Sequence, residues 1–174
     1  MNADQRERIE ALIDELPDEN EELARIIKAH KLSYLQRTGV RKAGAEVFEK
    51  NCATCHQVAG VGNKFAPNLD GIGNRGLDRI IEDIMAPNRN LDIAFRATTV
   101  ITRDGQVYTG LARPSEAKQL VLVDGNGMEK SIPLTLIRQK IPTKLSPMPA
   151  NFADVLNEEQ FRDLLAYLLS LRSL

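Results

Sequence analysis

The sequence predicts a mainly α-helical domain with a small antiparallel β insertion, preceded by an N-terminal helical hairpin. Apolar residues recur at helical spacing near both ends of the chain. Between these ends, at about residues 94–133, runs rich in β-branched residues flank the turn sequences Asp104-Gly105 and Asp124-Gly125-Asn126-Gly127. Such runs are typical of antiparallel hairpins. The third observation is the pentapeptide Cys52-Ala53-Thr54-Cys55-His56, which follows a short segment of helical pattern, residues 42–51.

Length and composition limit the classes of function. At 174 residues and 43% hydrophobic, the chain can bury one ordinary core and a small additional unit. A net charge of -1 gives no reason to expect nucleic acid or an anionic membrane surface as a partner. No apolar run approaches about 18 residues, so we expect no membrane span.

Residues 1–39 are predicted to form the helical hairpin, and residues 40–174 the main domain. Apolar positions at helical spacing over residues 3–16 are interrupted by Pro17, and a second helix is predicted over residues 19–38. The first helix is acidic and the second basic, which favours pairing between the helices over a docking surface. Their apolar stripes leave two alternatives open, a homodimer contact or a contact with a further module.

The C-x-x-C-H motif predicts covalent attachment of haem. Two thiols one helical turn apart can each bond a porphyrin vinyl group, while the adjoining imidazole binds the iron. A zinc site would need further ligands, but Cys52 and Cys55 are the only cysteines, and His30 is the only histidine besides His56. His30 lies near an apolar stripe, which favours a structural role. Redox-active thiols beside an incidental histidine remain the alternative.

A second iron ligand is sought among four methionines, at positions 1, 85, 128 and 148. Met85 falls in a predicted amphipathic helix, where filling the core is the usual role, and Met128 follows a turn. Met148 lies between Pro147 and Pro149, which stiffen the backbone and lack amide donors. We therefore predict Met148 as the ligand, with packing of the loop as the alternative.

Several positions resemble the class I cytochromes c. Gly44 and Phe48 precede the first cysteine by eight and four residues, as in that family, and residues 157–172 supply a C-terminal helix with Tyr167 at the family's aromatic position. The resemblance implies a cytochrome c fold, with the β insertion between the haem-binding motif and the methionine loop. It also implies one haem c, attached through Cys52 and Cys55.

The segment after the motif extends this resemblance. Pro67 and Leu69 match the family's P-x-L pattern, and a glycine-rich turn with Arg75 follows. By resemblance, the Pro67 carbonyl accepts a hydrogen bond from Nδ1 of His56, and Leu69 packs on the porphyrin. Arg75 is then expected near a haem propionate, with a solvated loop arginine as the alternative. The family also carries its methionine ligand just before the C-terminal helix, where Met148 lies.

The whole pattern resembles a narrower group, the haem-binding domain of planctomycete and verrucomicrobial exported proteins. The match rests on C-x-x-C-H, P-N-L-x-G-I-G-x-R, a hairpin insertion, S-x-M-P and D-L-L-A-Y-L. This resemblance implies that residues 1–39 are the tail of a preceding module. Because c-type haem is attached after export in bacteria and the N-terminus lacks a signal peptide, we expect a mature form or a domain of a longer exported, periplasmic protein.

The sequence therefore predicts an electron-transfer domain rather than an enzyme, and leaves weak peroxidase-type catalysis at the haem open as a further alternative. Its haem, ligated by His56 and Met148, would pass single electrons between a dehydrogenase module, fused or separate, and another redox protein. The alternative is a haem domain that binds or senses a small gas molecule through a displaceable sixth ligand. No other catalytic constellation accompanies the haem motif in the sequence.

Overall fold

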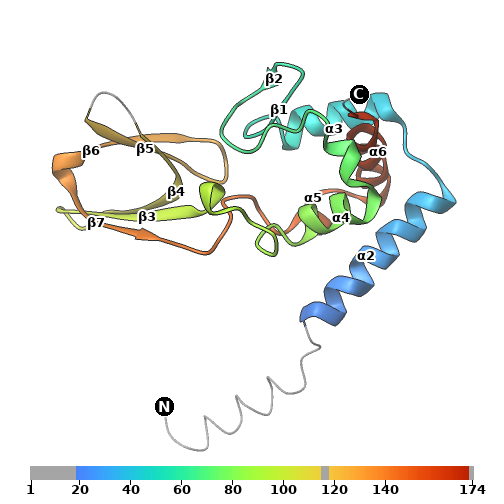
Figure 1. Cartoon of the computed structure of the whole chain (residues 1–174), viewed down its shortest axis with the longest axis horizontal. Coiled ribbons are helices and arrows are strands. Elements are labelled where there is room, and N and C mark those ends of the chain that lie inside the picture. The colour runs from blue at the N-terminus through green and yellow to red at the C-terminus, as the bar shows by residue number, and fades with distance from the viewer. Residues whose placement is uncertain (1–18, 115–117, 173–174) are drawn as a thin grey trace, which may run out of the picture.

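The computed structural model describes residues 19–114 and 118–172. The helix predicted over residues 3–16, and with it half of the predicted N-terminal hairpin, lies outside the described residues. Within the part that is described, no helix is long and apolar enough to cross a membrane. The helices lie together at one end of the molecule and the larger β-sheet at the other (Figure 1).

Four of the helices match segments that carry helical patterns in the sequence, and the short helix Phe152–Val155 was not predicted. The helices are α2 (Glu19–Gln36), α3 (Arg41–Asn51), α4 (Leu77–Met85), the short α5 (Phe152–Val155) and α6 (Glu158–Ser170). Single 3₁₀ turns form η1 (Ile72–Arg75), η2 (Ile93–Phe95) and η3 (Leu134–Leu136). Helix α6 begins with a capping box, in which Asn157 and Gln160 each bond the other's backbone N–H.

Helices α3 and α6 cross in direct backbone contact at Gly44. A Cβ atom at this position would overlap the carbonyl group of Asp163 on α6, so only glycine allows the approach. One helical turn later the Phe48 ring packs against Tyr167, with 5.6 Å between ring centroids. This crossing fixes the end of α3, which leads directly into the C-x-x-C-H motif.

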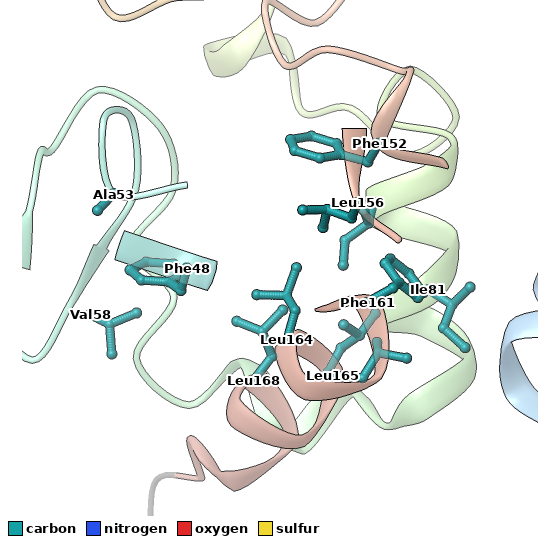
Figure 2. Packing of buried hydrophobic residues seen from close by; sticks show 12 residues of the cluster. Phe48, Ala53, Val58, Ile81, Phe152, Leu156, Phe161, Leu164, Leu165 and Leu168 are labelled. Atoms are coloured by element: carbon teal, nitrogen blue, oxygen red, sulfur yellow. The ribbon is translucent and has the colours of Figure 1, made fainter. Parts of the chain in front are cut away.

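The main hydrophobic core lies between these helices and the segment that follows the motif. Figure 2 shows Phe48 and Val58 on one side of this core, and Phe152, Leu156 and Leu164 on the other. Residues of α4 complete it, including the fully buried Ile81. The core therefore draws on chain segments from both sides of the β insertion.

Helix α2 packs on the outside of this core, against α4 and α6. The His30 ring lies on Phe161 of α6, with 4.3 Å between ring centroids. Lys31 forms an ion pair with Asp78 at 2.8 Å. These contacts agree with the structural role predicted for His30.

The inserted sheet has five antiparallel strands in the order β6-β5-β4-β3-β7. The strands are β3 (Ala97–Thr102), β4 (Val107–Pro114), β5 (Gln119–Val123), β6 (Glu129–Pro133) and β7 (Ile137–Pro142). The two predicted hairpins are present as β3–β4 and β5–β6, and their registers pair Val100 with Tyr108 and Leu122 with Lys130. A separate two-stranded ribbon, β1 (Gln57–Val58) and β2 (Val61–Gly62), follows the C-x-x-C-H motif.

The predicted fold class, mainly α with a small β insertion, was wrong. The insertion is a five-stranded sheet with its own hydrophobic cluster, centred on Val100, Leu120, Leu122 and Ile132. The domain is therefore α+β. The prediction missed the strand Ile137–Pro142, whose side chains are largely exposed and carry no alternating apolar pattern. This strand pairs with β3, from which it is distant in sequence, so local patterns could not reveal it.

Candidate haem site

The two cysteines and His56 lie on a single tight turn at the end of α3. The amide of Cys52 donates to the Phe48 carbonyl at 2.8 Å, and the amide of His56 donates to the Cys52 carbonyl at 2.8 Å. These bonds continue the direction of the helix through the motif. The motif thus has a defined backbone conformation in the polypeptide itself.

The free thiols are poor nucleophiles in the folded chain. Burial, and to a smaller extent the neighbouring Cys55, raise the pKa of Cys52 to about 12. Burial, followed by the negative charge of Asp124, also raises the pKa of Cys55. Reactive redox cysteines instead have a lowered pKa. The folded environment therefore disfavours the alternative of redox-active thiols.

His56 is held in the form that a metal ligand requires. Its Nδ1 lies 2.8 Å from the Pro67 carbonyl oxygen, which can only accept a hydrogen bond. Nδ1 must then carry the proton, and Nε2 keeps a free lone pair. Burial lowers the pKa of His56, although the bond to Pro67 acts in the opposite direction. The imidazole is consequently neutral near neutral pH.

Backbone hydrogen bonds fix the loop that carries Pro67 and Leu69 to the motif. The Ala66 amide donates to the Cys55 carbonyl at 2.8 Å, and the Leu69 amide to the Gln57 carbonyl at 2.9 Å. Leu69 is half-buried and packs against the main hydrophobic core. The positions predicted from the P-x-L pattern are thus brought together with Cys55 and His56.

Met148 is held by contacts from distant parts of the chain. Its half-buried side chain packs against the main core, as do Cys52 and Leu69. Its amide donates to Oγ of Ser146 at 3.1 Å, and the Ser146 amide donates to Oδ1 of Asn88 at 2.7 Å. The Ala97 amide at the start of β3 donates to the Leu145 carbonyl at 2.8 Å. The sheet and the α4–η2 connection therefore position the methionine loop.

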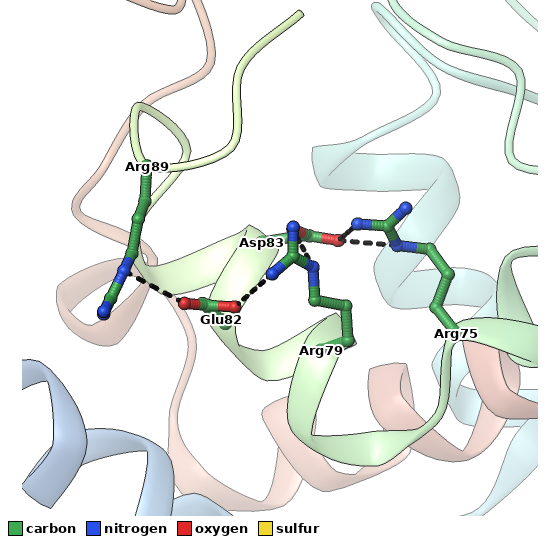
Figure 3. A network of polar contacts seen from close by, with 5 residues as sticks. All are labelled: Arg75, Arg79, Glu82, Asp83 and Arg89. Carbon is green, nitrogen blue, oxygen red and sulfur yellow. Dashed lines mark hydrogen bonds and ion pairs between the residues drawn. The ribbon is translucent and has the colours of Figure 1, made fainter.

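Arg75 belongs to a chain of ion pairs along α4. Its Nη2 lies 2.8 Å from Oδ2 of Asp83, which also faces Arg79 (Figure 3). Glu82 continues the chain, at 2.7 Å from Arg79 and 3.2 Å from Arg89. The structure thus gives Arg75 a protein partner, and its contact with a haem propionate remains a prediction.

The residues present fit a covalently bound haem. The surroundings combine an attachment motif, a neutral imidazole with a free Nε2, and apolar side chains suited to a porphyrin. Nε of Arg96, next to the residue that bonds the methionine loop, is buried and has no hydrogen-bond partner in the described part of the chain. A buried donor without an acceptor is costly, and an anionic group of a bound cofactor would satisfy it.

This site defines a class of protein, one that carries a covalent haem for electron transfer. Comparison with known sequences gives the family. A sequence model described as cytochrome c matches residues 41–122. Cytochromes c of Cannabis sativa, Gossypium barbadense and Guizotia abyssinica are each 30% identical to the chain over 95 residues, which cover 48% of this chain and 86% of theirs. The chain belongs to the cytochrome c family, and its cofactor is covalently bound haem c.

Sequence reasoning missed three features around the site. Asn88 bonds the methionine loop, and Arg113 of β4 donates to the Lys64 carbonyl and lies over the Phe65 ring at 4.6 Å. The turn between β5 and β6 packs against Thr54 of the motif. The sequence marked this segment as a turn, but contained no signal that it meets residues so far away in the chain.

Proposed function

We propose that the domain carries single electrons on one haem whose iron is bound by His56 and Met148. The observation that carries this proposal is the 2.8 Å contact between Nδ1 of His56 and the Pro67 carbonyl, which leaves Nε2 free beside two correctly spaced cysteines. When bound, the haem supplies an iron that exchanges one electron between its ferric and ferrous states. Every other part of the function depends on how the polypeptide holds this group.

Each residue of the site has a distinct role in this proposal. Cys52 and Cys55 hold the cofactor through thioether bonds, and Pro67 keeps the His56 ring in one tautomer and one orientation. Leu69 and the main core exclude water from the cofactor. A site that keeps both iron ligands and excludes water rearranges little when the iron gains or loses an electron. This property suits an electron carrier.

Met148 supplies the thioether ligand opposite His56 in this proposal. Thioether ligation raises the reduction potential relative to a second imidazole. Packing of the Met148 side chain on the same core as Cys52 supports the assignment. The position lies beyond residues 41–122, the part matched by the family model.

The test compares two equal substitutions, Met148→Leu and Met85→Leu, in the haem-loaded protein. Both side chains are half-buried and pack against the same core. We expect the weak near-infrared Met-to-iron charge-transfer band in the wild type and in Met85→Leu, and its loss in Met148→Leu. A band that survives in Met148→Leu would exclude Met148 as the ligand.

Addition of CO to the ferrous protein separates the carrier from a gas-binding or gas-sensing domain. A six-coordinate carrier shows no prompt spectral change. High-spin character together with rapid CO binding in the wild type would make the sensing function the better account. The hydrogen bonds that hold the methionine loop favour the carrier.

Arg75 and Arg96 are the proposed partners of the haem propionates. Arg96 is the stronger candidate, since its buried Nε lacks an acceptor, whereas Arg75 is paired with Asp83. Arg96→Lys removes that Nε donor and keeps the charge. We expect the reduction potential to change more in Arg96→Lys than in Arg75→Lys, measured by redox titration, and the reverse order would favour Arg75.

The proposed setting is the periplasm, where the domain accepts electrons from a dehydrogenase module and passes them to another redox protein. The resemblance to haem-binding domains of planctomycete and verrucomicrobial exported proteins supports this setting. Denaturing electrophoresis of periplasmic extract, stained for covalent haem, tests it. A stained band well above 19.4 kDa supports a fused module. A band near that mass supports a separate carrier, and haem found only in the cytoplasm excludes export.

A homodimer is the remaining proposal about partners. Helix α2 exposes Leu35, with 63% of its surface accessible, and Leu32, with 49% accessible. Light scattering coupled to gel filtration distinguishes a dimer from a monomer. Loss of the dimer in Leu35→Glu would place the contact on α2.

A further inference from the structure

The turn between β5 and β6, residues 124–128, has a well-defined shape. Oδ1 of Asp124 accepts hydrogen bonds from the amides of Asn126 at 2.8 Å and Met128 at 2.9 Å. The Gly127 amide donates to the Asp124 carbonyl at 3.0 Å, and Gly127 has a left-handed backbone with φ of 75°. These hydrogen bonds from the side chain and the backbone of Asp124 hold the turn in one defined conformation.

One side of this turn packs on the haem-attachment motif. A Cβ atom at Gly127 would overlap Cγ2 of Thr54 and lie 3.2 Å from the Thr54 carbonyl oxygen. Thr54 lies between the two cysteines. The turn therefore lies over the segment that joins the two attachment points.

The same turn packs on the loop that carries Met148. A Cβ atom at Gly125 would lie 2.9 Å from the carbonyl oxygen of Pro147, the residue before Met148. The same turn thus contacts two segments that are far apart in the sequence and that flank the candidate site. Glycine at positions 125 and 127 is what allows both contacts to be so close.

A second contact holds the sheet in place beside the motif. The Arg113 guanidinium of β4 donates to the Lys64 carbonyl and stacks on Phe65. The Phe65 amide in turn donates to the Cys55 carbonyl at 3.1 Å. The sheet is therefore anchored to the attachment segment at two points, the Arg113 contact and the packing of the turn on Thr54.

We propose that the Asp124–Met128 turn is a clasp that joins the haem-attachment motif to the Met148 loop and keeps other ligands from the iron. This inference rests on the proposed His56 and Met148 ligation. For another ligand to bind, Met148 must leave, and its loop must move away from the motif. The clasp opposes this movement because it packs against both segments.

The experiment compares Gly127→Ala with Gly105→Ala in the haem-loaded protein. Both glycines occupy turns of the same sheet with left-handed backbones, φ of 75° and 85°, so both substitutions introduce similar backbone strain. A Cβ atom at Gly105 meets nothing within 4 Å, whereas one at Gly127 collides with Thr54. The difference between the two variants therefore reports the contact with the motif.

The readout is the rate at which imidazole displaces the native ligand of the ferric protein, followed by absorbance. We expect Gly127→Ala to raise this rate about tenfold and Gly105→Ala to change it less than about twofold. Equal rates in the two variants would overturn the clasp. Exchange of the Thr54 and Cys55 amide hydrogens should accelerate in Gly127→Ala alone.

A rescue experiment isolates the atoms involved. Thr54→Ser removes Cγ2, the atom that a Cβ at 127 would overlap, and keeps the hydroxyl group. The double variant Thr54→Ser/Gly127→Ala should therefore bind imidazole more slowly than Gly127→Ala. The variant Thr54→Ser alone gives the effect of the serine by itself. Absence of any rescue would contradict the proposed contact.

A second variant and the charge-transfer band distinguish the remaining outcomes. If Gly127→Ala does not accumulate with haem, Gly125→Ala replaces it, since its Cβ presses on the Pro147 carbonyl without requiring a left-handed backbone. The charge-transfer band in Met148→Leu tests the ligation separately. Loss of that band with no difference between the Gly127 and Gly105 variants refutes the clasp alone. A band retained in Met148→Leu refutes ligation by Met148. Amide exchange at Thr54 and Cys55 in Gly127→Ala then tests the contact between the turn and the motif.

Discussion

The two loops that carry the proposed iron ligands are fixed by different kinds of contact. The His56 loop is held by short-range bonds, such as the one that His56 Nδ1 donates to the Pro67 carbonyl and the one that the Ala66 amide donates to the Cys55 carbonyl. The Met148 loop is held by Asn88, the start of β3 and the β5–β6 turn, all distant in sequence. One ligand position is therefore encoded locally, and the other depends on the correct assembly of an inserted sheet.

The largest expected effect comes from Gly44→Ala. This substitution disrupts the crossing of α3 and α6, which supports the C-x-x-C-H motif and the His56 loop. The new Cβ would overlap the backbone of Asp163, and neither helix can yield by a side-chain rotation. We expect the free energy of unfolding to fall by about 3 kcal/mol, measured by denaturant titration. Glu49→Ala, at an exposed position of the same helix, is the control. A loss below about 1 kcal/mol would mean that α3 and α6 can separate without penalty.

Leu122→Ala tests whether the sheet supports the Met148 loop without also supporting the His56 loop. Leu122 is 2% exposed in the cluster of the sheet, and its truncation should cost about 2 to 3 kcal/mol. During denaturation of this variant, the Met-to-iron band should disappear before the far-ultraviolet helical signal. Val121→Ala, on the opposite, half-exposed face, should leave the two transitions coincident. Coincident transitions in Leu122→Ala would show that both loops depend on one cooperative unit.

Asn88→Ala removes one hydrogen bond that holds the Met148 loop, the bond from the Ser146 amide to Oδ1 of Asn88. The lost partner of the Ser146 amide should cost about 1 kcal/mol and raise the rate of imidazole binding about fivefold. Asn90→Ala is a matched control in the same turn, at an exposed position. If the two variants behave alike, the bond at 2.7 Å does not restrain the loop.

The smallest effect is a pH dependence from His30. Burial against Phe161 lowers the pKa of His30, although Glu158 acts in the opposite direction. The unfolded chain binds a proton near pH 6.5 and the folded chain only at lower pH, so stability falls as the pH decreases from about 7.5 through about 6.5. In the haem-loaded protein with His56 on iron, His30→Gln should flatten this slope in unfolding measurements. An unchanged slope would assign it to other groups.

This contrast also explains what the sequence could predict. The P-x-L pattern led to the contact between Pro67 and His56 because both residues lie in one short segment. Residues 137–142 gave no strand signal, since pairing with β3 requires no apolar alternation in an edge strand. The turn at Asp124 was recognisable from its glycines, but its packing on Thr54 depends on the assembled sheet. The sequence pattern placed Arg75 near a haem propionate by resemblance, and its ion pair with Asp83 became visible only in the fold.

The contact between Gly127 and Thr54 has a consequence for biogenesis. Thr54 lies between the two cysteines, so in the folded chain the turn packs directly on the segment to which the haem must be joined. The turn that covers Thr54 is synthesised well after the motif. Joining of the cofactor is therefore favoured while the chain is still open, before the sheet folds over the motif.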